Sequence, residues 1–185
     1  GNLQGDYLLL QSEDGVMHKI EKDILKPHLR GGNIGKYKNL VSNEWLIFPY
    51  KLINGKAAIL TPEEIKLKYP YCWEYIESFE KTLREREKGR FDNDLWYQYS
   101  RNQAISVMEQ PKLITPEVCF GSSITYDSHN YYHNSKCHTL LLNEKSEYSL
   151  KSILPIINSK LFWFYLSQTG NVLRGGYIGV KRKVL

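Results

Sequence analysis

The sequence predicts an α+β fold in which a twisted, mainly antiparallel sheet is supported by helices. Asn54-Gly55 lies between two short apolar runs, and this dipeptide is typical of the two-residue turn of a β-hairpin. Helical periodicity is confined to a few segments, chiefly residues 71–88 and 150–168. Further short, strand-like runs occupy residues 112–119, 123–126 and 137–142.

The first half of the chain alternates between loop and strand signals. Leu25-Lys26-Pro27 ends any helix there, and the composition of residues 28–37 is that of a loop. Residues 44–51 are apolar and contain Pro49, which predicts a strand at a sheet edge. Residues 57–60 form the returning strand of the hairpin.

Helix signals follow the hairpin. Thr61-Pro62-Glu63-Glu64 is a capping box with proline at the first helical position, so a short helix begins here. Residues 71–88 carry apolar side chains on one helical face and predict one long helix that Gly89 caps. Residues 91–105 are irregular and 128–136 form a polar turn. Residues 150–168 predict two helices, the second with Ser159 as N-cap.

Composition is that of a globular protein with two positively charged segments. The chain has 185 residues, a net charge of +5 and 14 Tyr, which fits one domain over residues 1–185. Residues 24–60 hold six basic residues against one acid, and residues 170–185 hold four and no acid. Such local excess is what a polyanion-binding face requires.

The expected compartment is a reducing cytoplasm without membrane contact. Three cysteines at wide spacing do not form a disulfide framework. Every apolar run is far shorter than the ~20 residues of a membrane-spanning helix.

Signatures of catalysis are missing. No apolar strand leads into Gly31-Gly32-Asn33-Ile34-Gly35, as a nucleotide or S-adenosylmethionine site requires, and no Asn-Pro-Pro-Tyr motif is present. Glu64-Ile65-Lys66 resembles part of a metal-dependent nuclease motif, but its glutamate belongs to the capping box. We therefore expect no catalysis and no cofactor in this fragment.

A zinc site or a hydrolase built on histidine and cysteine is the enzymatic alternative. The residues concerned are Cys119, His129, His133, Cys137 and His138. No Cys-x-x-Cys pair accompanies them, and buried cysteines with histidines in turns explain the same pattern. We expect no bound zinc.

Seven segments, in order, resemble the TaqI-like C-terminal specificity domain of adenine-specific DNA methyltransferases and their fused restriction enzymes. They are KPHLRGGNIGKY (26–37), LIFPY (46–50), the helix at 71–88, WYQYSRNQ (96–103), PKLI (111–114), INSKLF (157–162) and RGGY (174–177). The chain departs from the family pattern at His28, where Tyr is common, and at Asn33, where Asp is common.

The resemblance implies a target-recognition domain at the C-terminal end of a longer restriction-modification polypeptide. Its partners would be double-stranded DNA and the N-terminal methyltransferase/endonuclease region, where S-adenosylmethionine binds and an adenine is flipped. A protein-interaction module that never touches DNA is the alternative from another functional class.

The DNA-binding candidates fall in three segments, which we expect to converge on one face. Arginine in a glycine-flanked loop suits guanine, Asn and Gln amides suit adenine, and lysines suit phosphates. For each residue a structural role is the competing interpretation; Arg30, for example, can brace its loop against a carboxylate. The candidates are Arg30, Asn33, Lys36, Tyr37, Arg101, Asn102, Gln103, Arg174, Tyr177, Lys181, Arg182 and Lys183.

Overall fold

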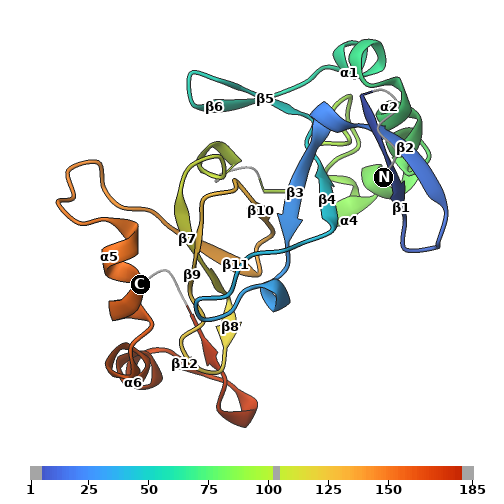
Figure 1. Ribbon diagram of the computed structural model, residues 1–185. Coiled ribbons are helices and arrows are strands. Elements are labelled where there is room, and N and C mark those ends of the chain that lie inside the picture. Colours follow the sequence, from blue (N-terminus) through green and yellow to red (C-terminus); the bar gives the residue numbers. More distant parts are fainter. Residues whose placement is uncertain (1–5, 102–104, 181–185) are drawn as a thin grey trace. The chain divides into compact units, whose positions relative to one another are not determined.

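The structure is a computed structural model that describes residues 6–101 and 105–180 (Figure 1). The chain divides into two compact units. Unit 1 comprises Gly1–Lys26 and Trp45–Val107, and unit 2 comprises Pro27–Glu44 and Met108–Leu185. The prediction of a single domain over residues 1–185 stays a prediction.

The α+β class is confirmed, with a difference in how the strands are distributed. In the described part of the chain the strands form five small sheets of two or three strands rather than one continuous sheet. Most pairings are antiparallel, as predicted, whereas β3 (Leu25–Leu29) runs parallel to β10 (Tyr132–His133).

Unit 1 contains two hairpins. β1 (Tyr7–Gln11) pairs with β2 (Met17–Glu21), and β5 (Tyr50–Ile53) pairs with β6 (Lys56–Ile59). Asn54 and Gly55 both have positive φ, 49° and 74°. The predicted turn at Asn54-Gly55 is therefore confirmed, with the backbone that a type I′ turn requires.

The predicted strand over residues 44–51 is interrupted. β4 (Glu44–Ile47) ends before Phe48, and β5 begins after Pro49. Proline has no N–H to donate to a ladder, and here the N–H of Phe48 donates instead to the carbonyl of Ile24 in the short η1 (Lys22–Ile24).

The helix α1 (Pro62–Lys68) begins as predicted. Thr61 accepts from the Glu64 N–H at 3.2 Å, and the Glu64 carboxylate accepts from the Thr61 N–H at 2.9 Å. The same carboxylate pairs with Lys51 at 2.6 Å. Glu64 thus has two structural partners, in line with its assignment to a capping box.

The prediction of one helix over residues 71–88 is wrong. The chain forms α2 (Pro70–Glu77), α3 (Glu80–Arg84) and α4 (Arg86–Gly89), and Phe79 between the first two leaves the helical region. Glu87 and Lys88 are left-handed, as is Gly89. The Arg86 guanidinium donates to the carbonyls of Trp96 and Gln98, which ties these turns to the segment that follows.

The core of unit 1 lies between the first hairpin, the helices and the segment after them. Its buried members include Ile24, Ile65, Trp73, Trp96 and Tyr97. The described chain resumes with η3 (Ile105–Val107).

Unit 2 is built around β7 (Lys112–Pro116), which is buried along its whole length. β7 lies between β9 (Thr125–Asp127) and β11 (Cys137–Leu140). A second small sheet has the order β12 (Asn171–Val172), β13 (Ile178–Gly179), β8 (Val118–Cys119). The segment 128–136, which was predicted to be a polar turn, contains the strand β10. Tyr132 of this strand is buried.

The predicted helix pair at the end of the chain is confirmed as α5 (Leu150–Ile157) and α6 (Lys160–Thr169). Ser159 caps α6 by accepting from the Phe162 N–H at 3.1 Å. Asn158, buried between the two helices, accepts from the Ile124 N–H and donates to the Ile124 carbonyl. The asparagine of the INSKLF segment therefore fastens the helix pair to the chain before β9.

In the part of the chain that the structure describes, no helix has the length and apolar character needed to cross a membrane.

Candidate nucleic-acid interface

Arg30 lies where β3 passes into the short η2 (Gly31–Asn33) of unit 2, and its side chain is braced. Its Nε donates to the Glu44 carboxylate at 2.8 Å, and Nδ1 of His28 lies 3.3 Å from the same oxygen. Arg30 is nevertheless exposed, with 61% of its side chain accessible. The structural role that the sequence left open for Arg30 thus has a geometric basis.

Electrostatics favours the charged form of this pair. Partial burial opposes ionisation of Glu44, but the hydrogen bonds and charges of Arg30 and His28 outweigh it and lower the pKa of the carboxyl. A lowered pKa keeps Glu44 negative at neutral pH, so the charge of Arg30 is largely compensated.

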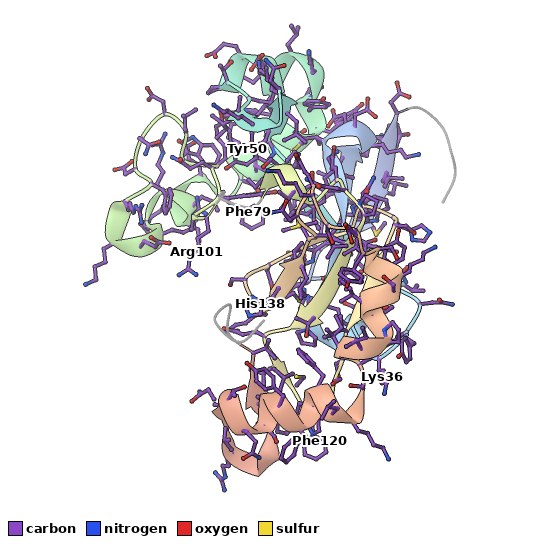
Figure 2. All side chains as sticks on the ribbon, turned by 90° about the vertical axis from the view of Figure 1, so that its left-hand side faces the viewer. Lys36, Tyr50, Phe79, Arg101, Phe120 and His138 are labelled. Carbon is purple, nitrogen blue, oxygen red and sulfur yellow. The ribbon has the colours of Figure 1, made fainter. Side chains whose placement is uncertain are left out.

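The rest of this loop is also held by its own contacts. Asn33 accepts from the Arg30 N–H at 2.8 Å, so its amide oxygen closes the η2 turn. Lys36 is exposed, and its ammonium lies 5.6 Å from the centre of the Tyr37 ring (Lys36 is labelled in Figure 2). Tyr37 is 54% exposed and has a left-handed backbone, with φ of 54°. Lys36 and Tyr37 are therefore the accessible members of the loop.

Arg174 lies on η4 (Arg174–Gly176), the turn between β12 and β13 of unit 2, coloured red in Figure 1. Gly175 and Gly176 both have φ of 80°, a backbone that side-chain-bearing residues rarely adopt. The turn is closed by a hydrogen bond from the Leu173 N–H to the Tyr177 carbonyl at 2.8 Å.

The Arg174 side chain extends into solvent, unlike that of Arg30, which is held by Glu44. It is exposed, and among the described residues it has no hydrogen bond or ion pair. Tyr177, 47% exposed, follows directly. The turn thus carries an exposed guanidinium without an ion pair among the described residues, and an exposed aromatic residue follows it in the chain.

Phe120 is a neighbour of this turn that sequence reasoning missed. Its ring centre lies 5.6 Å from that of Tyr177, and 69% of the residue is exposed. The available signal was a large aromatic residue directly after a strand and before Gly121. That signal did not link Phe120 to Tyr177.

The two loops of unit 2 adjoin neighbouring parts of one segment. A Cβ on Gly31 would lie 3.7 Å from the Pro116 side chain, and the Val180 N–H donates to the Glu117 carbonyl at 2.8 Å. The loop and the segment that follows β13 therefore both contact the end of β7.

The third predicted segment belongs to unit 1. Trp96 and Tyr97 are core residues, 3% and 6% exposed, and the Tyr97 hydroxyl donates to the Leu60 carbonyl. Because both rings are buried, they cannot belong to a DNA-facing surface. Arg101, a candidate in the same segment, is exposed and accessible to DNA (Figure 2). The predicted convergence of three segments stays a prediction.

Five candidates lie outside the described residues. They are Asn102, Gln103, Lys181, Arg182 and Lys183.

The histidine and cysteine side chains of unit 2 have local structural partners. Cys137 packs with Leu29, Ile34 and Ile114, and burial raises the pKa of its thiol to about 11. His133 contacts the Thr139 hydroxyl at 2.6 Å, and His138 contacts the Val180 carbonyl at 2.8 Å.

No group of three or more His, Cys, Asp or Glu suited to a metal ion occurs among residues 6–101 and 105–180. The expectation that the protein holds no zinc stays a prediction.

Comparison with known proteins agrees with the sequence resemblance. The model of the TaqI-like C-terminal specificity domain family matches residues 26–185. A curated relative, the type II restriction enzyme and methyltransferase RM.Eco57I of Escherichia coli, is 24% identical over 185 residues. The match covers 92% of this chain and 18% of the relative's length.

Proposed function

Because the chain belongs to the TaqI-like C-terminal specificity domain family, we propose that it recognises a target sequence in double-stranded DNA. The relative's name joins a restriction enzyme and a methyltransferase, and this chain spans 18% of that relative's length. The proposed partner is therefore a methyltransferase/endonuclease region of the same polypeptide. S-adenosylmethionine would bind in that region, and this fragment would contribute recognition without catalysis.

The observation that carries the proposal is the exposed guanidinium of Arg174, which lies on a glycine turn and has no ion pair within residues 6–101 and 105–180. A guanidinium can donate two parallel hydrogen bonds to guanine O6 and N7 in the major groove. Gly175 and Gly176 carry no side chains that would keep a base edge away from the backbone. Arg174 therefore suits direct base contact.

The remaining candidates suit other parts of the DNA. Lysines and arginines near the turn would neutralise phosphates and set the position of the protein, without sequence information. The Asn102 and Gln103 amides match adenine N6 and N7. The proposed phosphate contacts are Lys36, Lys181, Arg182 and Lys183.

Arginine replacement tests the base contact. In the full-length polypeptide, Arg174→Ala should cost ~1–3 kcal/mol of binding at cognate sites and relax specificity at one base pair. Selection from duplexes with a randomised core, followed by sequencing, measures the site preference. An unchanged preference would contradict the proposed role of Arg174.

Lysine replacement is the matched control. Lys183→Ala should weaken binding to all sequences alike and lower the slope of affinity against salt by about one unit. Binding isotherms on cognate and unrelated duplexes at several salt concentrations measure both effects.

An interaction module is the second candidate, and α6 is the observation that favours it. Leu161, Phe164 and Tyr165 follow one side of this helix and are 77%, 62% and 49% exposed, although Leu166 on the other side is buried. A helix that is apolar all round is typical of a buried position. The occupant we propose for this side is the methyltransferase region of the same polypeptide.

Salt dependence separates the two candidates. Recognition of DNA requires affinity that falls steeply with salt, because bound counterions are released. A full-length polypeptide in which α6 packs against the methyltransferase region, and which shows no such DNA binding, would support the second candidate over the first.

A further inference from the structure

Phe120 and Tyr177 form an exposed aromatic pair at the turn that also carries Arg174. Their ring centres are 5.6 Å apart with planes at 58°, and the residues are 69% and 47% exposed. Phe120 follows β8 and Tyr177 precedes β13, and these two strands are hydrogen-bonded neighbours. The pairing therefore places both rings at the same end of the two strands (Phe120 is labelled in Figure 2).

The glycine turn leaves room for the Phe120 ring. A Cβ on Gly176 would lie 3.2 Å from Cε2 of Phe120, closer than ordinary van der Waals contact. Any side chain at position 176 would push the phenyl ring away, so the ring and the turn that carries Arg174 form one assembly.

Charge around the pair favours a polyanion over a protein of mixed charge. Residues 148–185 contain no acidic residue. The nearest acid along the chain from β8 is Glu117, and its carboxylate is 3.3 Å from the Lys136 ammonium. The aromatic pair thus lies on a turn whose charged residue is the basic Arg174.

We propose that Phe120, supported from the side by Tyr177, stacks on a base of the target DNA next to the base pair that Arg174 contacts. This inference rests on the proposed function and adds a second binding group to it. A phenyl ring next to a base-contacting arginine can insert at a base step or cover an exposed base face. Tyr177 limits the ring's freedom, so less conformational entropy is lost on binding.

The test uses the full-length polypeptide and a pool of DNA duplexes with a randomised core. The duplex that the wild-type protein enriches is then bound by Phe120→Ala, Phe120→Trp and Phe79→Ala. Phe79 is the matched control because it is the same residue type, is 44% exposed and also lies against a tyrosine ring, that of Tyr75 at 5.2 Å.

Loss of the ring should weaken binding of the enriched duplex about tenfold, since stacking contributes ~1–3 kcal/mol per base. Phe120→Trp should keep affinity within about twofold, and Phe79→Ala should match the wild type. 2-Aminopurine placed in turn at each base of the enriched site should show, besides the change at a flipped adenine, a fluorescence change at one further position that is absent in Phe120→Ala. Thermal unfolding of Phe120→Ala should be unchanged because the ring is exposed.

Two results overturn the inference in distinguishable ways. Wild-type affinity in Phe120→Ala, or equal losses in Phe120→Ala and Phe79→Ala, would refute stacking while leaving the proposed function intact. A wild-type polypeptide that binds no duplex would refute the proposed function and the stacking with it.

Discussion

The segments Arg30-Gly31-Gly32 and Arg174-Gly175-Gly176 have the same three residues and opposite surroundings. Arg30 donates to Glu44 and heads a turn that Asn33 closes. Arg174 heads a turn made by two left-handed glycines and has no polar partner among the described residues. Arg30 is held in place by its contacts, and Arg174 is exposed to solvent.

The difference shows that the sequence around an arginine does not determine its role. Compensation by Glu44 weakens the attraction of Arg30 for a phosphate or a guanine, because the two charges lie 2.8 Å apart. Arg174 keeps its full charge for a ligand. The Arg30 loop accordingly contributes to stability, and the Arg174 turn is the segment suited to binding.

The largest expected contrast is in stability and concerns the first large apolar residue after each Arg-Gly-Gly segment, Ile34 in the loop and Tyr177 in the turn. Ile34 is 7% exposed and packs with Leu29, Ile114 and Cys137, so Ile34→Ala should lower the free energy of unfolding by about 2–5 kcal/mol. Tyr177→Ala should cost less than about 1 kcal/mol, because its ring is half exposed. Urea unfolding followed by tryptophan fluorescence measures both. Equal losses would show that the turn is as much a part of the core as the loop.

Local signals in the sequence predicted several elements correctly. The turn at Asn54-Gly55, the capping box at Thr61 and the N-cap at Ser159 each depend on residues within one turn of the chain. The breaks in the predicted helix over 71–88 could not be found in this way. They accompany hydrogen bonds from Arg86 to carbonyls at Trp96 and Gln98, which no helical periodicity encodes.

The candidate interface was predictable to a similar extent. Glycines and an arginine in RGGY identified the exposed turn, but Phe120 contacts Tyr177 only because β8 pairs with β13. The brace on Arg30 likewise depends on Glu44, which lies fourteen residues further along the chain. Tertiary pairing, rather than any motif, distinguishes the two Arg-Gly-Gly segments.

An intermediate contrast concerns the second glycine of each segment. Gly176 has φ of 80° and touches Phe120, so Gly176→Ala should destabilise the protein by about 1–3 kcal/mol through backbone strain. Gly32 does not have a positive φ, and a Cβ added there would meet no heavy atom within 4 Å. Gly32→Ala should therefore be neutral or stabilise by up to ~1 kcal/mol. The denaturant midpoints of the two variants measure these changes in stability. An unchanged midpoint for Gly176→Ala would show that the turn can form without a left-handed glycine at position 176.

The smallest expected contrast is one of pH. Glu44 has a pKa below its ordinary value of 4.5, since hydrogen bonds from Arg30 and His28 outweigh the opposing effect of burial. A lowered pKa contributes stability above the unfolded value, and this contribution is lost as pH falls through the folded value. Glu44→Gln should therefore cost ~0.5 kcal/mol near pH 6, as exposed ion pairs do, and less near pH 3.

Arg174 has no such carboxylate partner among the described residues, so Arg174→Met should change stability equally at both pH values. Unfolding curves at pH 3 and pH 6 measure both variants. A cost of Glu44→Gln that is the same at both pH values would show that shape rather than charge holds the Arg30 loop.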